Sequence, residues 1–259
     1  MTKNILLTND DGIYAEGLWA LYKRFAPQHA VTVVAPDRER SAVGHGITLY
    51  KPLRQTKIEV GDGLCGYAVS GTPVDCIKMG LMKILDKRPD LVISGINLGA
   101  NVGININYSG TVAAAREAAI YKVPAIAVSV KGDDLMEYDE AARFTAHLAE
   151  QVFKKGLPSG TILNVNIPDI PMEEVVGTRI SRQAIELYTE YLEKRVDPRN
   201  RTYYWHGHVP TTSLNSPDAD AVALDRNYIS ITPIKCDMTD YSLLEELKGW
   251  GIGKKKSQS

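Results

Sequence analysis

The feature that most constrains the fold is a repeated alternation of short apolar runs with helical patterns. Runs of strand length that are apolar or β-branched are found at residues 4–8, 31–35, 90–94, 125–130 and 162–167. Between them, apolar residues recur near helical spacing in the segments 73–85, 111–121 and 141–152. Strands that are apolar throughout are typical of a parallel sheet covered by helices on both faces. The pattern therefore predicts an α/β protein with a doubly wound, Rossmann-like parallel sheet.

Composition and charge are those of an ordinary globular protein. The 259 residues suffice for one large α/β domain with or without an appendage, and 44% are hydrophobic while 24% are charged. A formal net charge of -1 gives no electrostatic reason for nucleic acid to be a main partner. No apolar run approaches the roughly 20 residues that span a bilayer, so we expect no membrane partner.

The start of the chain and its cysteines indicate a cytoplasmic protein. The N-terminus leads straight into the run at 4–8, without the charged, apolar and cleavage regions of a signal peptide. Cys65, Cys76 and Cys236 are widely spaced and form no Cys-x-x-Cys pair. An odd number of such residues predicts free, mostly buried thiols in a reducing compartment. Cys76, within the 73–85 segment, is expected to pack in the core.

Two adjacent carboxylates, Asp10 and Asp11, come directly after the first strand-like run. Open α/β sheets bind ligands at the carboxyl ends of their strands. Because neighbouring carboxylates repel each other, a hard divalent cation such as Mg²⁺ or Mn²⁺ is the usual compensation. Gly12 permits a tight turn before the helix that follows. A solvated Asp-Asp-Gly turn is the alternative interpretation.

Phosphatases of the haloacid-dehalogenase type also carry aspartates after their first strand, in the order Asp-x-Asp, and the first aspartate is the nucleophile. When Asp11 is aligned with the second aspartate of that pattern, Asn9 occupies the nucleophile position. A neutral amide cannot form an acyl phosphate by carboxylate attack. The sequence therefore argues against that mechanism.

Three further polar segments are placed where a ligand crevice is expected. Segment 36–46 follows the second strand-like run, and segment 95–103 holds three glycines and two asparagines, which suit close backbone approach to a ligand. Segment 109–111, Ser-Gly-Thr, opens an Ala-rich helix and offers free N–H groups to a phosphate. A plain N-cap is the alternative role of Ser109. With the aspartate pair, these groups are the parts that metal-assisted phosphate-ester hydrolysis requires.

Four motifs carry a resemblance to a known family. In chain order they are LTNDDG at 7–12, PDRERS at 36–41, SGINLGAN at 94–101 and YSGTVAAA at 108–115. They resemble the SurE family of survival phosphatases, which act as metal-dependent 5'(3')-nucleotidases. The resemblance covers the N-terminal two-thirds of the chain, and the last third carries no motif that aligns residue by residue.

The resemblance implies a site. It assigns one divalent cation per subunit to the oxygen ligands Asp10, Asp11, Ser41 and Asn97. It places the substrate phosphate at Asn101, Ser109, Gly110 and Thr111. An all-oxygen ligand set favours Mg²⁺ or Mn²⁺, with Ca²⁺ able to replace them in a crystal, over zinc, which prefers His or Cys.

The expected function is hydrolysis of nucleoside monophosphates by a metal-dependent phosphomonoesterase that uses an activated water. Asp10 is the candidate for orienting or deprotonating the water, Asp11 for holding the metal, and Asn101 for stabilising charge on the phosphoryl oxygens. Ser109 as a covalent nucleophile is disfavoured because no His or Lys base neighbours it in sequence. Two alternatives are a non-catalytic nucleotide or phosphate sensor and a metal-dependent glycosyl- or nucleotidyl-transferase.

The pattern of strands and helices weakens after Pro171, which suggests three parts. We expect a catalytic core at 1–184, a projecting extension at 185–226, and a returning strand, short helix and flexible tail at 227–259. The extension holds aromatic residues of the types enriched at subunit interfaces, Tyr188, Tyr191, Tyr203, Tyr204 and Trp205. A hairpin that packs on or exchanges with another subunit would give a homodimer or tetramer, as the resemblance also suggests. A flap over the crevice is the alternative.

Two other polar residues are interpreted as structural. His45 is expected to be a solvated loop histidine, with donation to the leaving oxygen as the alternative. Glu117, two turns into the Ala-rich helix, is expected to lie at the surface.

Overall fold

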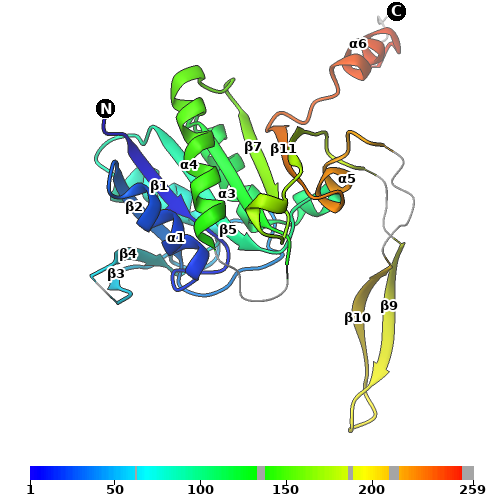
Figure 1. Cartoon of the computed structure of the whole chain (residues 1–259). Helices are drawn as coiled ribbons and strands as arrows, with labels where there is room; N and C mark the ends of the chain where they lie inside the picture. The colour runs from blue at the N-terminus through cyan, green and yellow to red at the C-terminus, as the bar shows by residue number, and fades with distance from the viewer. Residues whose placement is uncertain (62, 133–137, 186–188, 210–215, 253–259) are drawn as a thin grey trace, which may run out of the picture.

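A nine-stranded sheet forms the centre of the protein in the computed structural model, which describes residues 1–61, 63–132, 138–185, 189–209 and 216–252. Its strands are β1 (Asn4–Thr8), β2 (Ala30–Pro36), β3 (Gln55–Glu59), β4 (Cys65–Val69), β5 (Leu91–Leu98), β6 (Ala125–Val130), β7 (Thr161–Ile167), β8 (Gly177–Ile180) and β11 (Tyr228–Lys235). They follow the order β3-β4-β2-β1-β5-β6-β7-β11-β8 (Figure 1).

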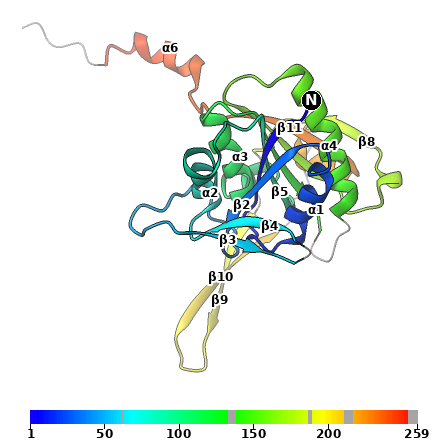
Figure 2. The same cartoon turned by 90° about the vertical axis from the view of Figure 1, so that its left-hand side faces the viewer.

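Helices cover both faces of this sheet. The helices of the described residues are α1 (Glu16–Phe25), α2 (Pro73–Met79), α3 (Gly110–Ile120), α4 (Tyr138–Lys155), α5 (Asp220–Asp225) and α6 (Tyr241–Gly249), with a π-helical turn at Gly80–Ile84 and 3₁₀ turns at Gly103–Asn107 and Met172–Glu174. Helix α6 has no buried residue and extends away from the sheet (Figure 1). Figure 2 shows α1 and α4 on one side of the sheet and α2 and α3 on the other. The expected doubly wound α/β fold is therefore confirmed.

The central strand β1 shows why an apolar run gives a buried parallel strand. Ile5 and Leu7 belong to the core layer that contains the buried faces of α1 and α4, whereas Leu6 belongs to the layer of α2 and α3. Because successive side chains of a strand point to opposite faces, a strand covered on both sides must be apolar at every position.

Two pairings depart from the expected all-parallel sheet. Strand β3 pairs antiparallel with β4, and β11 pairs antiparallel with β7. Residues 60–64 connect β3 to β4, and so short a connection cannot make the crossover that a parallel pair needs. The sheet is mostly parallel rather than wholly so.

The order of the strands reverses at β1, the position at which open α/β sheets bind their ligands. β2 pairs with one edge of β1 and β5 with the other, with Thr8 opposite Ser94. The chain therefore leaves the carboxyl ends of β1 and β5 toward opposite faces of the sheet. β5 extends to Leu98, past the predicted end at residue 94, so Asn97 lies in the strand, beyond a register shift between Ser94 and Asn97.

The C-terminal third contains a projecting hairpin and a segment that returns to the body. Strands β9 (Thr189–Val196) and β10 (Thr202–Val209) form a separate two-stranded antiparallel sheet that extends away from the body in both views (Figures 1 and 2). The buried helix α5 then packs against β11. The division into core, extension and tail stays a prediction, and Tyr188 and the expected flexible tail from residue 253 lie outside the described residues.

All three cysteines are free, but only Cys76 is buried as predicted. Cys65 is exposed and Cys236 is half-buried, so the expectation of mostly buried thiols was wrong. Cys65 starts the short strand β4 near one edge of the sheet, where less of the protein covers it. In the part of the chain that the structure describes, no helix has the length and apolar character needed to cross a membrane.

Candidate active site at the carboxyl edge of the sheet

The turn after β1 is held by the side chain of Asn9. Asn9 is fully buried, its Nδ2 donates to the carbonyl oxygen of Gly12 at 3.0 Å, and its Oδ1 accepts from the N–H of Gly12 at 3.2 Å. Gly12 has a φ of +101°, and a Cβ there would lie 3.0 Å from the backbone of Arg38. The Asn9 amide is therefore occupied in shaping the turn that presents the two aspartates.

Asp10 lies against the N-terminus of α3. Its side chain is buried, its Oδ1 accepts a hydrogen bond from the hydroxyl of Thr111, and its Oδ2 is 2.8 Å from where a Cβ on Gly110 would stand. Burial raises the pKa of Asp10, while the Thr111 hydroxyl and the backbone N–H groups of Thr111 and Gly110 oppose that rise. The structure thus brings Asp10 together with two of the predicted phosphate-binding residues.

Asp11 is half-buried beside Asp10. Its pKa is raised to about 7, first by burial and then by the negative charges of Asp10 and Glu39. Such a group is costly to ionise unless a positive charge lies next to it. Two crowded carboxylates of this kind fit a hard divalent cation, which would hold both in their charged form.

Asn97 and Ser41, the other two predicted metal ligands, differ in their hydrogen bonds. The amide Nδ2 of Asn97 donates to the carbonyl oxygens of Leu98 and Gly99 at 3.1 and 2.7 Å, so Oδ1 is the atom suited to a cation. Ser41 is exposed and its hydroxyl donates to Glu39 at 2.6 Å. Among the described contacts, none joins Ser41 directly to Asp10 or Asp11.

The neighbour of Ser41 does reach the aspartates. The backbone N–H of Arg40 donates to the carbonyl oxygen of Asp10 at 2.7 Å. The loop after β2 is therefore docked on the turn after β1, and Ser41 lies one residue beyond that contact. Glu39, which sequence reasoning did not single out, adds negative charge near Asp11 and binds Ser41.

Asn101 is held by a buried set of amides. The backbone N–H of Asn101 donates to Oδ1 of Asn166 at 2.7 Å, and its carbonyl oxygen accepts from Asn164 and Asn166 at 2.8 and 3.1 Å. Its side-chain Nδ2 donates to the hydroxyl of Ser129 at 2.8 Å. Asn164 and Asn166 were not predicted, although two asparagines at alternate positions of an otherwise apolar strand mark a polar patch on one face.

Ser109 is the N-cap of α3. Its side chain is buried, and its Oγ accepts a hydrogen bond from the N–H of Val112 at 3.1 Å. This is the capping role considered as the alternative from sequence, and it leaves the N–H groups of Gly110 and Thr111 facing Asp10. The positive end of the helix thus adjoins the carboxylate pair.

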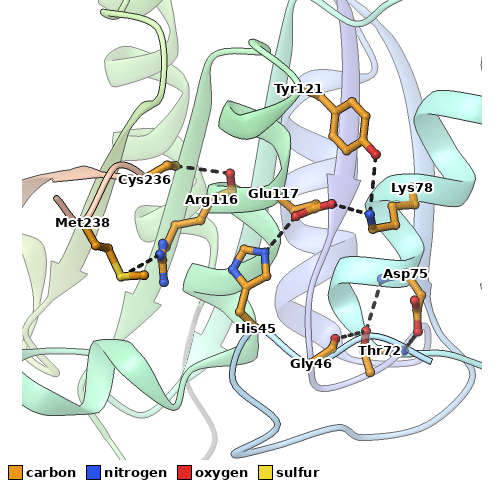
Figure 3. Close-up of polar contacts among 10 residues, drawn as sticks. All are labelled: His45, Gly46, Thr72, Asp75, Lys78, Arg116, Glu117, Tyr121, Cys236 and Met238. Carbon is orange, nitrogen blue, oxygen red and sulfur yellow. Dashed lines mark hydrogen bonds and ion pairs between the residues drawn. The ribbon is translucent and has the colours of Figure 1, made fainter. Parts of the chain in front are cut away.

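His45 and Glu117, which were interpreted separately from the sequence, are in contact with each other. Nε2 of His45 lies 2.8 Å from Oε2 of Glu117 (Figure 3). Glu117 is 5% exposed, so the expectation that it lies at the surface was wrong. His45 is half-buried rather than solvated. Glu117 faces α2 and the loop after β2. The spacing of residues within one Ala-rich helix does not reveal which other segments pack against it.

The fold and this edge define a class of protein. It is a doubly wound α/β protein with paired carboxylates, amide oxygens and a helix N-terminus at the strand-order reversal, the place where open α/β enzymes bind their ligands. Within the described residues no group of three or more His, Cys, Asp or Glu side chains gathers to hold a metal.

Comparison with known proteins identifies the family. Residues 5–190 match the family described as Survival protein SurE, and the chain belongs to that family. It is 53% identical over 251 residues to a protein named 5'-nucleotidase SurE from Desulfatibacillum aliphaticivorans, covering 97% of this chain and 99% of that protein. A protein of the same name from Moorella thermoacetica is 47% identical, with 95% of each covered.

A solved structure agrees with the fold. The crystal structure of the SurE protein from Aquifex aeolicus superposes with a TM-score of 0.84 at 38% sequence identity. The match covers 95% of this chain and 99% of that one. The similarity therefore includes most of the C-terminal third, where no motif aligned from sequence.

Proposed function

We propose that this protein is a divalent-metal-dependent 5'-nucleotidase that hydrolyses nucleoside monophosphates. The observation that carries the proposal is the contact between the buried carboxylate of Asp10 and the N-terminus of α3, with Asp11 beside it. A cation site and an anion site are thereby adjacent, as phosphate-ester hydrolysis requires. Relatives named 5'-nucleotidase SurE, aligned over nearly their whole length, support the choice of nucleotides as substrates.

The roles of the residues follow from their positions. Asp10, Asp11 and Asn97 would hold the cation, Mg²⁺ or Mn²⁺, with Ser41 joining from the loop after β2. A bound cation would lower the pKa of a water and neutralise charge on the phosphoryl oxygens. Asp10 would orient or deprotonate the attacking water. The N–H groups of Gly110 and Thr111, with Asn101, would stabilise charge that develops on the phosphoryl group.

Hydrolysis by water is preferred to a covalent route through Ser109. The Ser109 hydroxyl oxygen accepts the N–H of Val112 as the helix cap, and no basic side chain is hydrogen-bonded to it among the described contacts. An activated serine nucleophile requires such a base.

The test is a panel of substrates against a panel of metals. After treatment with EDTA, the protein should release inorganic phosphate from nucleoside 5'-monophosphates only when Mg²⁺ or Mn²⁺ is restored. Binding without phosphate release would support a sensor instead. Turnover of nucleotide sugars or triphosphates, with little attack on monoesters, would support a transferase.

We also propose that a second copy of this chain covers the projecting hairpin. Large apolar side chains of β9 and β10 are exposed in the isolated chain, namely Tyr191, Leu192, Tyr203, Tyr204 and Trp205. Helix α6 has no buried residue and exposes Leu243, Leu244 and Leu247. Exposed apolar surface of this extent on two projecting elements is typical of subunit interfaces. A homodimer or tetramer follows.

Replacing residues 189–209 by a short Gly/Ser link should reduce the size of the assembly measured by light scattering. The change spares α5, which is buried in the body. Trp205→Ser should weaken the assembly in the same direction, whereas Lys194→Ser, a polar change on the same hairpin, should not. A wild-type monomer would contradict the proposal, and an intact oligomer that has lost nucleotide selectivity would support the flap.

A further inference from the structure

The carboxylate of Glu117 joins three parts of the protein. It lies on α3 with a side chain 6% exposed, and one oxygen contacts Nε2 of His45 at 2.8 Å while the other contacts Nζ of Lys78 at 2.9 Å (Figure 3). Burial acts to raise the pKa of Glu117, but hydrogen bonds from His45 and Lys78 outweigh it and the pKa is lowered. Glu117 is therefore a charged anchor for both partners.

His45 belongs to a loop of residues 41–48 that is attached to the body at several points. Its side chain provides the contact to Glu117. The other attachments use the backbone of the loop. The N–H of Gly44 donates to the carbonyl oxygen of Tyr108 at 2.8 Å, and the carbonyl oxygen of Gly46 accepts from the Thr72 hydroxyl at 2.8 Å. The N–H of Thr48 donates to the two carboxylate oxygens of Asp75 at 3.1 and 3.2 Å. The His45 contact lies between these backbone attachments and ties the middle of the loop to α3.

The same loop begins with Ser41, next to the contact of Arg40 with Asp10. Ser41 itself is exposed, and its own contact is to Glu39 in the same segment. Its position relative to the aspartates therefore depends on how the loop is held. We propose that Glu117, acting through His45, is a positioning residue that keeps the 41–48 loop against α3 and so keeps Ser41 beside the contact of Arg40 with Asp10. The inference rests on the proposed function for the role of Ser41 in catalysis.

The geometry favours a positioning role for His45 over proton donation to the leaving group. Nε2 is engaged by Glu117, and Nδ1 is shielded from solvent without a hydrogen-bond partner in the described structure. A nitrogen that solvent does not reach is poorly placed to meet a substrate oxygen. The two roles predict different dependence on the leaving group, because a good leaving group needs no proton donor.

Lys78 offers a matched control. It binds the same carboxylate as His45 but lies on α2 and has no described contact with the loop. Lys78→Met therefore removes a partner of Glu117 without releasing residues 41–48. His45→Gln is the conservative variant, since its amide retains an N–H donor for Glu117.

The experiment compares His45→Ala, His45→Gln, Glu117→Gln and Lys78→Met by three measurements. These are amide hydrogen exchange at Gly44 and Thr48, affinity for Mn²⁺ alone, and kcat/KM on both a nucleoside 5'-monophosphate and p-nitrophenyl phosphate. His45→Ala should speed exchange in the loop, weaken Mn²⁺ binding, and lower kcat/KM by about 10- to 100-fold on both substrates alike. Glu117→Gln should change all three in the same direction, His45→Gln should recover most of the loss, and Lys78→Met should leave loop exchange and activity near wild type.

Several results would overturn the inference. Unchanged loop exchange in His45→Ala would show that the contact does not hold the loop, and an equal loss in Lys78→Met would indicate general destabilisation. A loss confined to the nucleoside monophosphate would make His45 a proton donor. If the wild-type protein hydrolyses neither substrate, the proposed function fails, while loop exchange and Mn²⁺ affinity still decide the positioning role.

Discussion

Replacement of Asp11 by asparagine is expected to lower kcat/KM by about 10²- to 10³-fold, the scale on which loss of one electrostatic group in an active site acts. The change keeps the shape of the side chain but removes a charge from the proposed cation site. Mn²⁺ affinity should fall with activity, and excess Mn²⁺ should restore only part of the loss. Phosphate release after EDTA treatment and graded addition of Mn²⁺ measures both effects.

The same substitution should make the metal-free protein more stable. Burial and the charges of Asp10 and Glu39 raise the pKa of Asp11 from 3.8 to about 7. The folded state therefore holds the Asp11 proton more tightly than the unfolded state. The contribution of Asp11 to the free energy of unfolding is therefore greatest at low pH and is lost as pH rises through about 7. Since Asp11 is partly exposed, the loss should be only about 1 to 2 kcal/mol. Asp11→Asn should remove this pH dependence.

Denaturant unfolding of the metal-free protein between about pH 5 and pH 8 tests the stability effect. Asp86→Asn is the control, because Asp86 is an exposed aspartate away from the crevice and its replacement should change neither activity nor the pH slope. Full activity of Asp11→Asn without added metal would refute the assignment. A pH slope identical to that of the wild type would contradict the stability effect.

Much of the fold was predictable because its physical cause is local. Every residue of β1 from Ile5 to Thr8 is buried, and a strand buried on both faces must read as a continuous apolar run. The helix start at Ser109 was predictable for the same reason, since a capping hydroxyl acts on an N–H three residues away. Strands β3 and β8 were not predicted, because both lie at the edges of the sheet, where β3 is mostly exposed and β8 alternates in exposure.

The residues of the candidate site could be proposed from the sequence, but their contacts could not. The motifs indicated which residues follow β1 and β5, and the strand-order reversal places them along one edge. Contacts between segments distant in sequence carried no local pattern. Asn166 holds Asn101 across 65 positions and His45 meets Glu117 across 72, so both pairs depend on how β7 and the loop after β2 pack.

The contact between Asp10 and Gly110 also joins two segments that are distant in sequence. Gly110 begins α3 and has no unusual backbone angle that would demand glycine. Glycine is required at this position by lack of space, because a Cβ there would lie 2.7 Å from the Cβ and 2.8 Å from Oδ2 of Asp10. Asp10 follows the central strand and is buried, so its backbone cannot easily retreat. An added methyl group must therefore displace the carboxylate from the helix N-terminus or shift the helix itself.

Gly110→Ala is accordingly expected to lower kcat/KM by about 10²-fold, because a displacement of about 1 Å at a reacting group has effects of that size. Overpacking should also destabilise the protein by about 1 to 3 kcal/mol, less the gain of up to about 1 kcal/mol from alanine in a helix. Gly249→Ala in α6 is the matched control, since nothing lies within 4 Å of its added Cβ, and it should retain full activity. The measurements are steady-state kinetics with Mn²⁺ and thermal unfolding of both variants. Wild-type kinetics in Gly110→Ala would show that the close approach of Asp10 to α3 is not needed for catalysis, and the proposed site would then have to be rebuilt around Asp11 and Asn97.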